Sequence, residues 1–473
     1  PEESAQASIR PADASKAGGR AGKTLNSARP AGSSRHACPK PGGQHAAGGQ
    51  RFQADQTSVP PNAATCLDKN APMATTRMLP ADLPSPSRAA AWLRVARIQA
   101  DRYAQTRNWI DGAVTGLSPY LTHGLVTLPE VVAALPELDS LAVNHKLIYE
   151  FGWREFFRHR WAHLGDGILE SLHPGPLPEH AYASTLPADI REARCGVAAI
   201  DVAIRDLYAT GTMHNHARMW LASYVVHLRR VHWRAGADWL LGHLLDGDLA
   251  SNHLSWQWVA GTGSHKPYLF NADNVARYAP AHWHSAGSPI DQDYDALEHI
   301  ARGASPVSGP SWHSLGVTEP PRITTPPPDI AVKTPDPAAL AALEGRPLWL
   351  VHSWALRAPP ADLPPETMVI GIYLADYHRA WPWSAARWRW VDAAMATISP
   401  RRWLLDAAQL ATIVRSAASV RCVDEPHLRQ WLAPPIQRDP APRLFPPVAS
   451  TCHSFSGWWR QATRGLQGAR ELL

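Results

Sequence analysis

Cysteine is scarce in this sequence and long apolar runs are absent, and each absence narrows the kinds of protein it can be. The five cysteines are an odd number without a CxxC pair, which favours a reducing compartment and offers no spacing suited to zinc or an iron–sulfur cluster. No run of 18 apolar residues occurs, and the N-terminus lacks a signal-peptide core. We therefore expect a cytoplasmic protein with no membrane span and no bound metal.

Charge is also low, and it is unevenly placed. Only 18% of the 473 residues are charged and 45% are apolar, which excludes a fully disordered chain, a coiled coil and a collagen-like repeat. The net charge of +5 arises in residues 1–90, which hold 11 basic and 6 acidic side chains, so the other 383 residues carry 35 of each sign. The folded part has no overall basic footprint, and any phosphate-binding face must be local.

Proline, glycine and serine mark the boundaries along the chain. Residues 1–86 contain Phe52 as their only aromatic residue and no sustained apolar period, so they predict a disordered tail. This tail is either passive or a loose polyanion contact through the basic residues of 10–51. Residues 285–346 are rich in Pro, Ser and Thr, which predicts a linker after a domain at 87–284.

Apolar periodicity indicates the fold class. The sequence predicts a mainly helical domain followed by a small α/β domain at 347–435 and a C-terminal extension at 436–473. Ser384 and Asp406 are expected to cap two helices of the α/β domain. Recurrence near 3.6 residues predicts helical segments at 89–110, 127–135, 142–164, 200–208, 214–230 and 235–245. Short β-rich apolar runs predict strands at 348–352, 368–374 and 419–423.

Two blocks of the helical domain carry polar and aromatic residues in patterns of interest. In the block 150–157, Glu150, Trp153 and Arg154 share one helix face, offering a carboxylate, a flat ring and a guanidinium to one surface. The alternative is an Arg–Glu pair beside a core Trp. In the block 211–220, His214 and His216 diverge because they are two residues apart on a helix, and no third ligand follows, so a metal site is disfavoured.

A third block, residues 244–258, is the most informative. Asp246, Asp248 and Asn252 precede a Trp-Gln-Trp sequence at Trp256–Trp258, and such acids and amides are unfavourable in a core unless they are hydrogen-bonded. A calcium loop does not fit, since the further acidic ligands and the terminal Glu are missing. The block suits a flat ligand with polar edges.

Together with residues 115–121, these three blocks resemble the flavin-binding helical domain of the DNA photolyase and cryptochrome family, in nearly the same order across residues 89–271. The resemblance implies FAD as the cofactor, with Asp246 placed to pair with Arg218. It also places Asn252 opposite flavin N5, as in the repair enzymes of the family. A neutral amide there can hydrogen-bond N5 in several redox and protonation states of the flavin. The implied cofactor-binding residues are Tyr103, Arg107, Thr115, Leu117, Ser118, Arg154, Arg218, Asp246, Asp248 and Asn252.

The resemblance also implies an activity: repair of UV-induced pyrimidine dimers in DNA by electron transfer from photoexcited reduced FAD. An extruded dimer needs flat side chains and polar groups for its edges. The alternative is a cryptochrome-like blue-light or redox photoreceptor that binds FAD without repair, and a third possibility is a silent DNA-binding or scaffold protein. The implied dimer contacts are Glu150, Trp153, Asn215, Met219 and Trp258. The implied electron-transfer residues are Trp256 and Trp233.

Some positions depart from the family pattern. The third Trp of the electron-transfer chain is missing, with Tyr182 as a nearby substitute, and His216 stands where the family usually has Arg. The usual basic stretch is absent too, so we expect weakened phosphate contacts with UV-damaged DNA. The antenna domain of the family normally comes first, whereas here residues 348–432 resemble it as if the order were permuted; an unrelated α/β module is the alternative. The antenna chromophore is left unassigned, and we expect a monomer.

Overall fold

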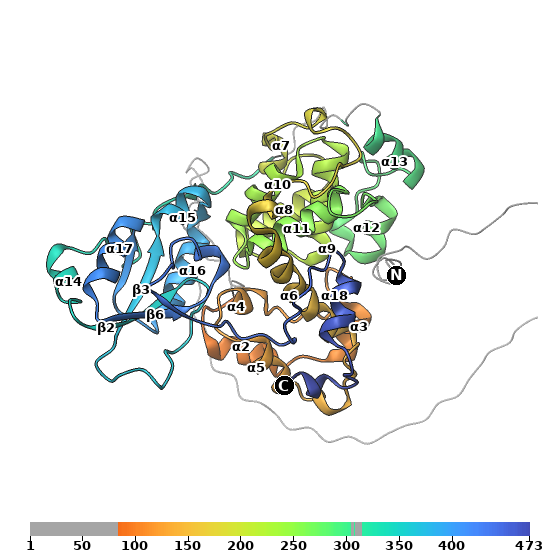
Figure 1. The fold of residues 1–473 in the computed structure, drawn as a ribbon. Coiled ribbons are helices and arrows are strands. Elements are labelled where there is room, and N and C mark those ends of the chain that lie inside the picture. Colours follow the sequence, from red (N-terminus) through yellow and green to blue (C-terminus); the bar gives the residue numbers. More distant parts are fainter. Residues whose placement is uncertain (1–83, 304–306, 308–314) are drawn as a thin grey trace, which may run out of the picture. The chain divides into compact units, whose positions relative to one another are not determined.

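The structure, a computed structural model, describes residues 84–303, 307 and 315–473 (Figure 1). The predicted disordered tail lies outside these residues except for its last three positions. Of these, Pro84 accepts a hydrogen bond from the indole of Trp390, and Ser85 accepts one from the Tyr120 hydroxyl at 2.9 Å. Within the described ranges, no helix is both long enough and apolar enough to cross a membrane.

The predicted fold class, mainly helical with a small α/β part, is confirmed, and Figure 1 shows the helical part in orange to green. Its α-helices are α2 (Arg88–Val95), α3 (Ala100–Thr106), α4 (Ser118–Thr122), α5 (Leu128–Ala133), α6 (Lys146–Leu164), α7 (Ala188–Arg191), α8 (Ala198–Thr210), α9 (Asn215–Ser223), α10 (Trp233–His243), α11 (Leu249–Ala260) and α12 (Ala272–Tyr278). Its shorter turns are η1 (Leu138–Ser140), η2 (Gly165–Leu169), η3 (Glu179–Ala181), the π-helical η4 (Tyr224–Leu228) and η5 (Ala281–Trp283).

Several segments of this domain differ from the predicted helices. Helices α4, α7 and α12 lie where the sequence predicted none. The predicted helix 89–110 is two helices, because the chain turns after α2 and buries both Ile98 and Ala100. Helix α11 was not among the predicted helices. Its buried residues lie on all sides, so its sequence lacks the one-sided apolar stripe by which a surface helix is detected.

A five-stranded parallel sheet, in blue in Figure 1, forms the second part, in the order β5-β3-β2-β6-β7. Its strands are β2 (Pro347–His352), β3 (Met368–Leu374), β5 (Arg402–Leu405), β6 (Ser419–Val423) and β7 (Gln437–Asp439). The accompanying helices are α15 (Ala375–Ala380), α16 (Ala385–Ala396), α17 (Ala407–Ser416) and η6 (Pro426–Leu428). Ser384 and Asp406 cap α16 and α17, as predicted.

The segments predicted as linker and extension also contain regular structure. Residues 285–346 include α13 (Tyr294–Arg302), β1 (Arg322–Ile323) and α14 (Pro337–Ala341), and β1 pairs antiparallel with β4 (Trp383–Ser384). The C-terminal segment includes β7, α18 (Phe455–Ala462) and η7 (Ala469–Leu472).

Two apolar clusters form the core. One joins the sheet to residues of α2, α4, α5, α6 and α18, and the other is built from α8, α9, α10 and α12. Helix α11 contributes to both, with Leu249 and Leu254 in the first and Trp256 in the second. The surfaces of α6, α9 and α11 between these clusters are where the candidate site lies.

Candidate functional site

A cavity of about 610 Å³ is lined by α3, α4, α6, α9, α10 and α11 and by the loops beside them. Its volume lies within the range of small-molecule sites, about 300–1,000 Å³. The structure brings most of the sequence-predicted site residues into its lining: Tyr103, Arg107, Thr115, Ser118, Glu150, Trp153, Arg154, Asn215, Arg218, Met219, Asp246, Asp248, Asn252 and Trp256. Segments more than 100 residues apart thus meet at one surface.

Three predicted residues do not line this cavity. Leu117 is fully buried in the first apolar cluster. Trp233 is also buried, and its indole donates to Ser171 Oγ at 3.0 Å. Trp258 is half-buried, with its ring centroid 5.8 Å from that of Tyr268. Their roles stay predictions.

The start of α11 orients the acidic and amide residues. Asp248 is the N-cap, and its Oδ1 accepts the Ser251 backbone N–H at 2.9 Å, which satisfies one free donor of the helix. Arg218 donates to both oxygens of Asp246, at 2.9 and 2.8 Å, so the predicted pair is confirmed. Asn252 is held by a 2.9 Å hydrogen bond from its amide to Ala237 O.

Helix α6 supplies the opposite wall, with Glu150, Trp153 and Arg154 all in the lining as their spacing predicts. Glu150 Oε1 pairs with Arg107 at 2.7 Å and with Lys146 at 2.9 Å. Arg154 instead donates to Thr122 Oγ1 and Leu121 O, each at 3.2 Å. Glu150 is therefore ion-paired, as in the alternative interpretation of the block 150–157. Its partners are Arg107 and Lys146, which lie outside that block, and not Arg154.

Trp153 is fixed from the C-terminal helix. The Phe455 ring of α18 stacks on it with centroids 4.1 Å apart and planes 10° apart. Close packing is possible because Gly152 lies beneath α18: a Cβ there would stand 2.5 Å from Cζ3 of Trp459. The sequence provided no sign that residues 455–462 would meet this site.

Sequence reasoning also missed Arg158, Glu425 and His427. Arg158 donates to Asp248 Oδ2 at 2.7 Å and to both oxygens of Glu425 at 2.9 and 3.0 Å, and Glu425 shares a 2.6 Å contact with His427 Nδ1. Burial opposes ionisation, yet the Arg158 and His427 charges lower the pKa of Glu425 to about 2. Arg158 lies one turn after Arg154, a spacing that could have revealed it. Glu425 has no comparable signal.

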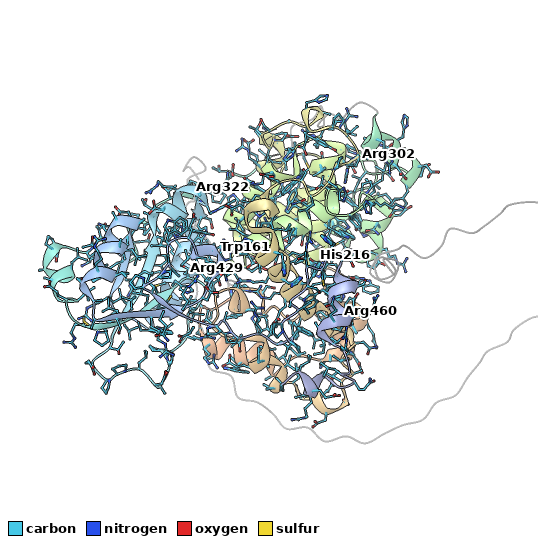
Figure 2. The ribbon with its side chains drawn as sticks, viewed as in Figure 1. Trp161, His216, Arg302, Arg322, Arg429 and Arg460 are labelled. Atoms are coloured by element: carbon cyan, nitrogen blue, oxygen red, sulfur yellow. The ribbon has the colours of Figure 1, made fainter. Side chains whose placement is uncertain are left out.

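His216 and Tyr182 are the two residues at which the sequence departs from the family pattern and for which the structure gives contacts. His216 (Figure 2) is 6% exposed, and its Nδ1 contacts Asn108 O, so burial lowers its pKa and it is unsuited to a phosphate contact. The Tyr182 ring lies 6.3 Å from that of His232, which lies 5.6 Å from that of Trp233. An aromatic route from Trp233 to Tyr182 thus exists in the structure.

Residues 147–287 match the family model for the FAD binding domain of DNA photolyase. This part of the chain is similar to the FAD binding domain of DNA photolyase. The predicted family resemblance and the predicted cofactor, FAD, are both confirmed. The match covers all the cavity-lining residues that follow Leu147, including those of the α11 block.

Similar proteins include both branches of this family. A deoxyribodipyrimidine photo-lyase of Streptomyces griseus is 36% identical over 152 residues, or 32% of this chain and 33% of the relative. A chloroplastic/mitochondrial cryptochrome DASH of Ostreococcus tauri is 32% identical over 206 residues, or 41% of this chain and 38% of the relative. The matched part spans less than half the length of curated relatives such as these, from 29% to 49%.

Among solved structures, the crystal structure of a bacterial class III photolyase from Agrobacterium tumefaciens is similar over 46% of this chain and 54% of the other. The sequence identity is 24% and the TM-score 0.37.

The residues of the photolyase-type cavity fit FAD. His214 Nε2 and Ser251 Oγ both belong to lining residues and are buried without a hydrogen-bond partner in the described structure. A bound ligand with polar edges would satisfy them. Burial, followed by the nearby Glu150 carboxylate, raises the pKa of Tyr103, which keeps its hydroxyl protonated as a donor. The cavity lining also holds both arginines and acids. The arginines suit the phosphates of FAD, and the acids suit its ring N–H groups.

Proposed function

We propose that this chain is a light-driven DNA repair enzyme that splits UV-induced pyrimidine dimers, as its relatives named deoxyribodipyrimidine photo-lyase do. One observation supports this most directly. The cavity that carries the FAD-binding residues of α11 also carries Glu150, Trp153, Asn215 and Met219, which the resemblance assigns to the dimer. The residues proposed for the cofactor and those proposed for the dimer therefore line one cavity.

The chain's own groups would hold FAD in this space. Thr115 and Ser118 would bind its diphosphate, Arg154 and Arg218 would lie beside it, and Asn252 would hydrogen-bond the ring edge. The chemistry that FAD would supply here is light-driven electron transfer to the dimer.

The protein contributes position and electrostatics. Arg107 and Lys146 orient the carboxyl group of Glu150. In its protonated form this group would donate a hydrogen bond to a dimer carbonyl and stabilise negative charge developing there. Trp153 offers a flat face for an extruded base, while Met219 and Asn215 complete the wall. Contacts to the DNA phosphates are expected to be weak, because His216 is buried and its Nδ1 is hydrogen-bonded to the backbone oxygen of Asn108.

Glu150→Ala tests this proposal. We expect repair of dimer-containing DNA under blue light to fall about 100-fold, because removing one group aimed at developing charge costs about 10²–10³ in rate. The flavin absorption of the dark-purified protein should be unchanged. Glu137→Ala, at an exposed position, is the matched control. Unchanged repair in the Glu150 variant would disprove the substrate assignment, and a colourless wild-type protein would disprove flavin binding.

A blue-light photoreceptor without repair is the second candidate, favoured by the Phe455 ring that covers one face of Trp153. It predicts flavin bands that bleach under blue light with reductant while dimer DNA stays unrepaired. The same two assays therefore separate the two functions.

A further inference from the structure

The first turn of α11 is held in part from outside the helical domain. Asp248 caps this helix through the Ser251 N–H, which leaves the N–H of Leu249, the first helical residue, without a partner in its own helix. His427 Nε2, in η6 of the α/β part, accepts that N–H at 3.2 Å. A residue of the α/β part thus completes the capping of a helix that lines the flavin cavity.

The hydrogen bonds of His427 determine where its proton lies. Because Nε2 accepts from Leu249, the proton of the neutral ring is on Nδ1, which donates to Glu425 Oε1 at 2.6 Å. Burial outweighs the nearby carboxylates and lowers the pKa of His427, so the ring is neutral at pH 7. The Trp354 ring stacks on it with centroids 4.4 Å apart and planes 11° apart, which fixes its orientation.

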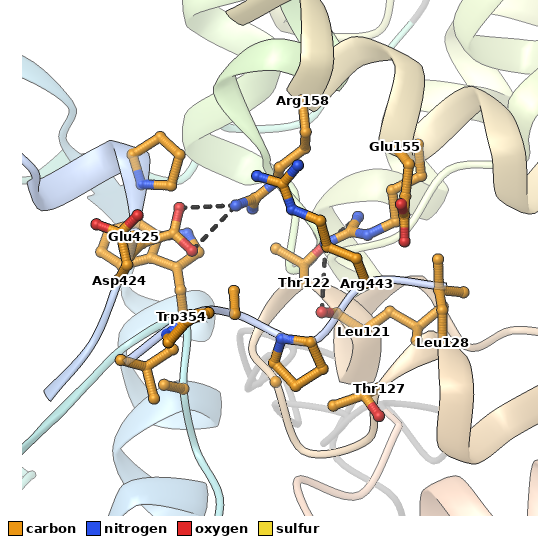
Figure 3. A pocket seen from close by; sticks show the side chains of 18 of the residues that line it. Leu121, Thr122, Thr127, Leu128, Glu155, Arg158, Trp354, Asp424, Glu425 and Arg443 are labelled. Carbon is orange, nitrogen blue, oxygen red and sulfur yellow. Dashed lines mark hydrogen bonds and ion pairs between the residues drawn. The ribbon is translucent and has the colours of Figure 1, made fainter. Parts of the chain in front are cut away.

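Glu425 makes a second connection to the same turn. Both of its oxygens accept from Arg158 Nη1 of α6, at 2.9 and 3.0 Å, and Figure 3 shows the two side chains pointing toward each other. Arg158 Nη2 donates to Asp248 Oδ2 at 2.7 Å. The side chains of Glu425 and Asp248 are only 5% and 1% exposed, so solvent and salt screen their charges little.

Asp248 is the point at which this network meets the flavin cavity. Its side chain belongs to the lining of that cavity, whereas Arg158 and Glu425 line a neighbouring one. Glu425 therefore reaches the flavin cavity through Arg158. The other cations beside Asp248 are Arg154 and Arg387, which keep their charge when Glu425 loses its own. Neutralising Glu425 thus leaves one more uncompensated positive charge beside the cavity.

We propose that Glu425 and His427 are positioning residues of the flavin cavity, which fix the start of α11 from the α/β part and, through the charge of Glu425, set the redox potential of the bound flavin. A negative charge held beside a flavin opposes the uptake of electrons, because reduction adds negative charge to the ring. The proposal rests on the flavin-binding part of the proposed function and not on dimer repair.

Spectroelectrochemical titration of the flavin-loaded full chain measures the potential. We expect Glu425→Gln to raise it, so that the ratio of reduced to oxidised flavin at the wild-type midpoint rises about tenfold, or about 59 mV for a one-electron couple. Gln has the size of Glu and keeps an oxygen for Arg158. Asp392→Asn is the matched control, because it removes another buried carboxylate of the α/β part, one paired with Arg402 at 2.7 Å. Its potential should equal that of the wild type.

A second variant tests the neutral contact. His427→Phe keeps a ring beside Trp354 and changes no charge, but it removes the acceptor for the Leu249 N–H. We expect it to weaken flavin binding about tenfold, through the loss of this hydrogen bond and of the one to Glu425, while the midpoint potential stays at the wild-type value. Fluorescence titration of the flavin-free chain with FAD measures the affinity. His378→Phe is the control, a buried histidine whose ring contacts lie within the α/β part.

Near-ultraviolet circular dichroism checks that each variant is folded. An unchanged potential in a flavin-loaded Glu425 variant would overturn the role of its charge. Should that variant lose its fold, the His427 variant decides, and wild-type flavin affinity there would overturn the positioning role. A wild type that repairs no dimers would contradict only the repair function, since both measurements need only bound flavin. A wild type that binds no flavin would overturn both proposals.

Discussion

Asp248 and Glu425 are two buried carboxylates that share one guanidinium. Arg158 bridges them, and its charge, aided for Asp248 by that of Arg154, keeps the pKa of both well below the ordinary range although burial acts in the opposite direction. The arrangement links the N-cap of α11 to the segment after β6. An ion-pair network at the flavin cavity thus depends on a residue of the α/β domain.

This network predicts acid sensitivity. The pKa of Glu425 is about 2 in the fold against an ordinary value of 4.5, so its ionised form stabilises the protein above about pH 4.5, and that stability is lost as pH falls toward 2. The shift corresponds to about 3 kcal/mol. We expect Glu425→Gln to lower the free energy of unfolding at pH 7 by about this amount and to flatten its decline between pH 5 and 3.

Urea unfolding of the wild type and the Glu425 variant at several pH values measures the free energy of unfolding and so tests this prediction. Glu344→Gln, at an exposed position without a side-chain partner in the described structure, is the control. A Glu425 variant whose stability declines with acid as steeply as that of the wild type would show that another group is responsible.

At the scale of elements, α18 is the clearest case of a segment whose role depends on packing. Ser454 caps it by accepting the Gly457 N–H at 3.2 Å, and Phe455 and Trp458 are buried against α6. The helix thereby supports Trp153 from the side of Phe455.

Truncating Phe455 tests how much α18 contributes. Phe455→Ala should lower the free energy of unfolding by about 3–5 kcal/mol, the usual cost of removing a buried aromatic ring. It should also shift the tryptophan fluorescence of the native protein, because Trp153 loses its stacked neighbour. Guanidinium unfolding with fluorescence detection measures both, and Ser456→Ala on the same helix serves as the control. A cost below about 1 kcal/mol would mean that α18 is loosely attached.

At the scale of the whole molecule, Arg387 joins the α/β domain to the helical one. This fully buried residue of α16 donates to Leu241 O at 3.0 Å and to Gly247 O at 2.6 Å, and its guanidinium lies 4.1 Å from the Trp383 ring centroid. Burial lowers its pKa to about 10, so it remains charged at neutral pH. The bend that carries Asp246 is therefore held from the neighbouring domain.

Arg387→Met should weaken this junction. It leaves two buried carbonyl oxygens unpaired, each at a cost of about 1–3 kcal/mol. We expect scanning calorimetry to show one unfolding transition for the wild type and two for the variant, with less flavin retained on purification. Arg389→Met, on the solvent side of the same helix, should behave as the wild type does. One unchanged transition in the Arg387 variant would show that other contacts hold the domains together.

How far the sequence predicts the sheet varies with the strand. Strands β3 and β6 have the predicted bounds, because their β-rich apolar runs are local signals. By contrast, β7 reads Gln-Arg-Asp, which has no apolar pattern, and it is a strand because it pairs with β6 at the sheet edge. Periodicity cannot reveal a strand that is defined by its neighbour.

The same division applies to the site. The sequence by itself singled out residues of α6 and α11 that line the flavin cavity. Helical spacing placed Glu150, Trp153 and Arg154 on one face, and the co-ordered motifs marked Asp246, Asp248 and Asn252, because both signals are properties of short segments. Only the tertiary structure decided that Phe455 would stack on Trp153 and that Glu425 would share Arg158 with Asp248. These contacts join residues between 90 and about 300 positions apart. Burial of distant surfaces against each other produces them, and no local pattern encodes that pairing.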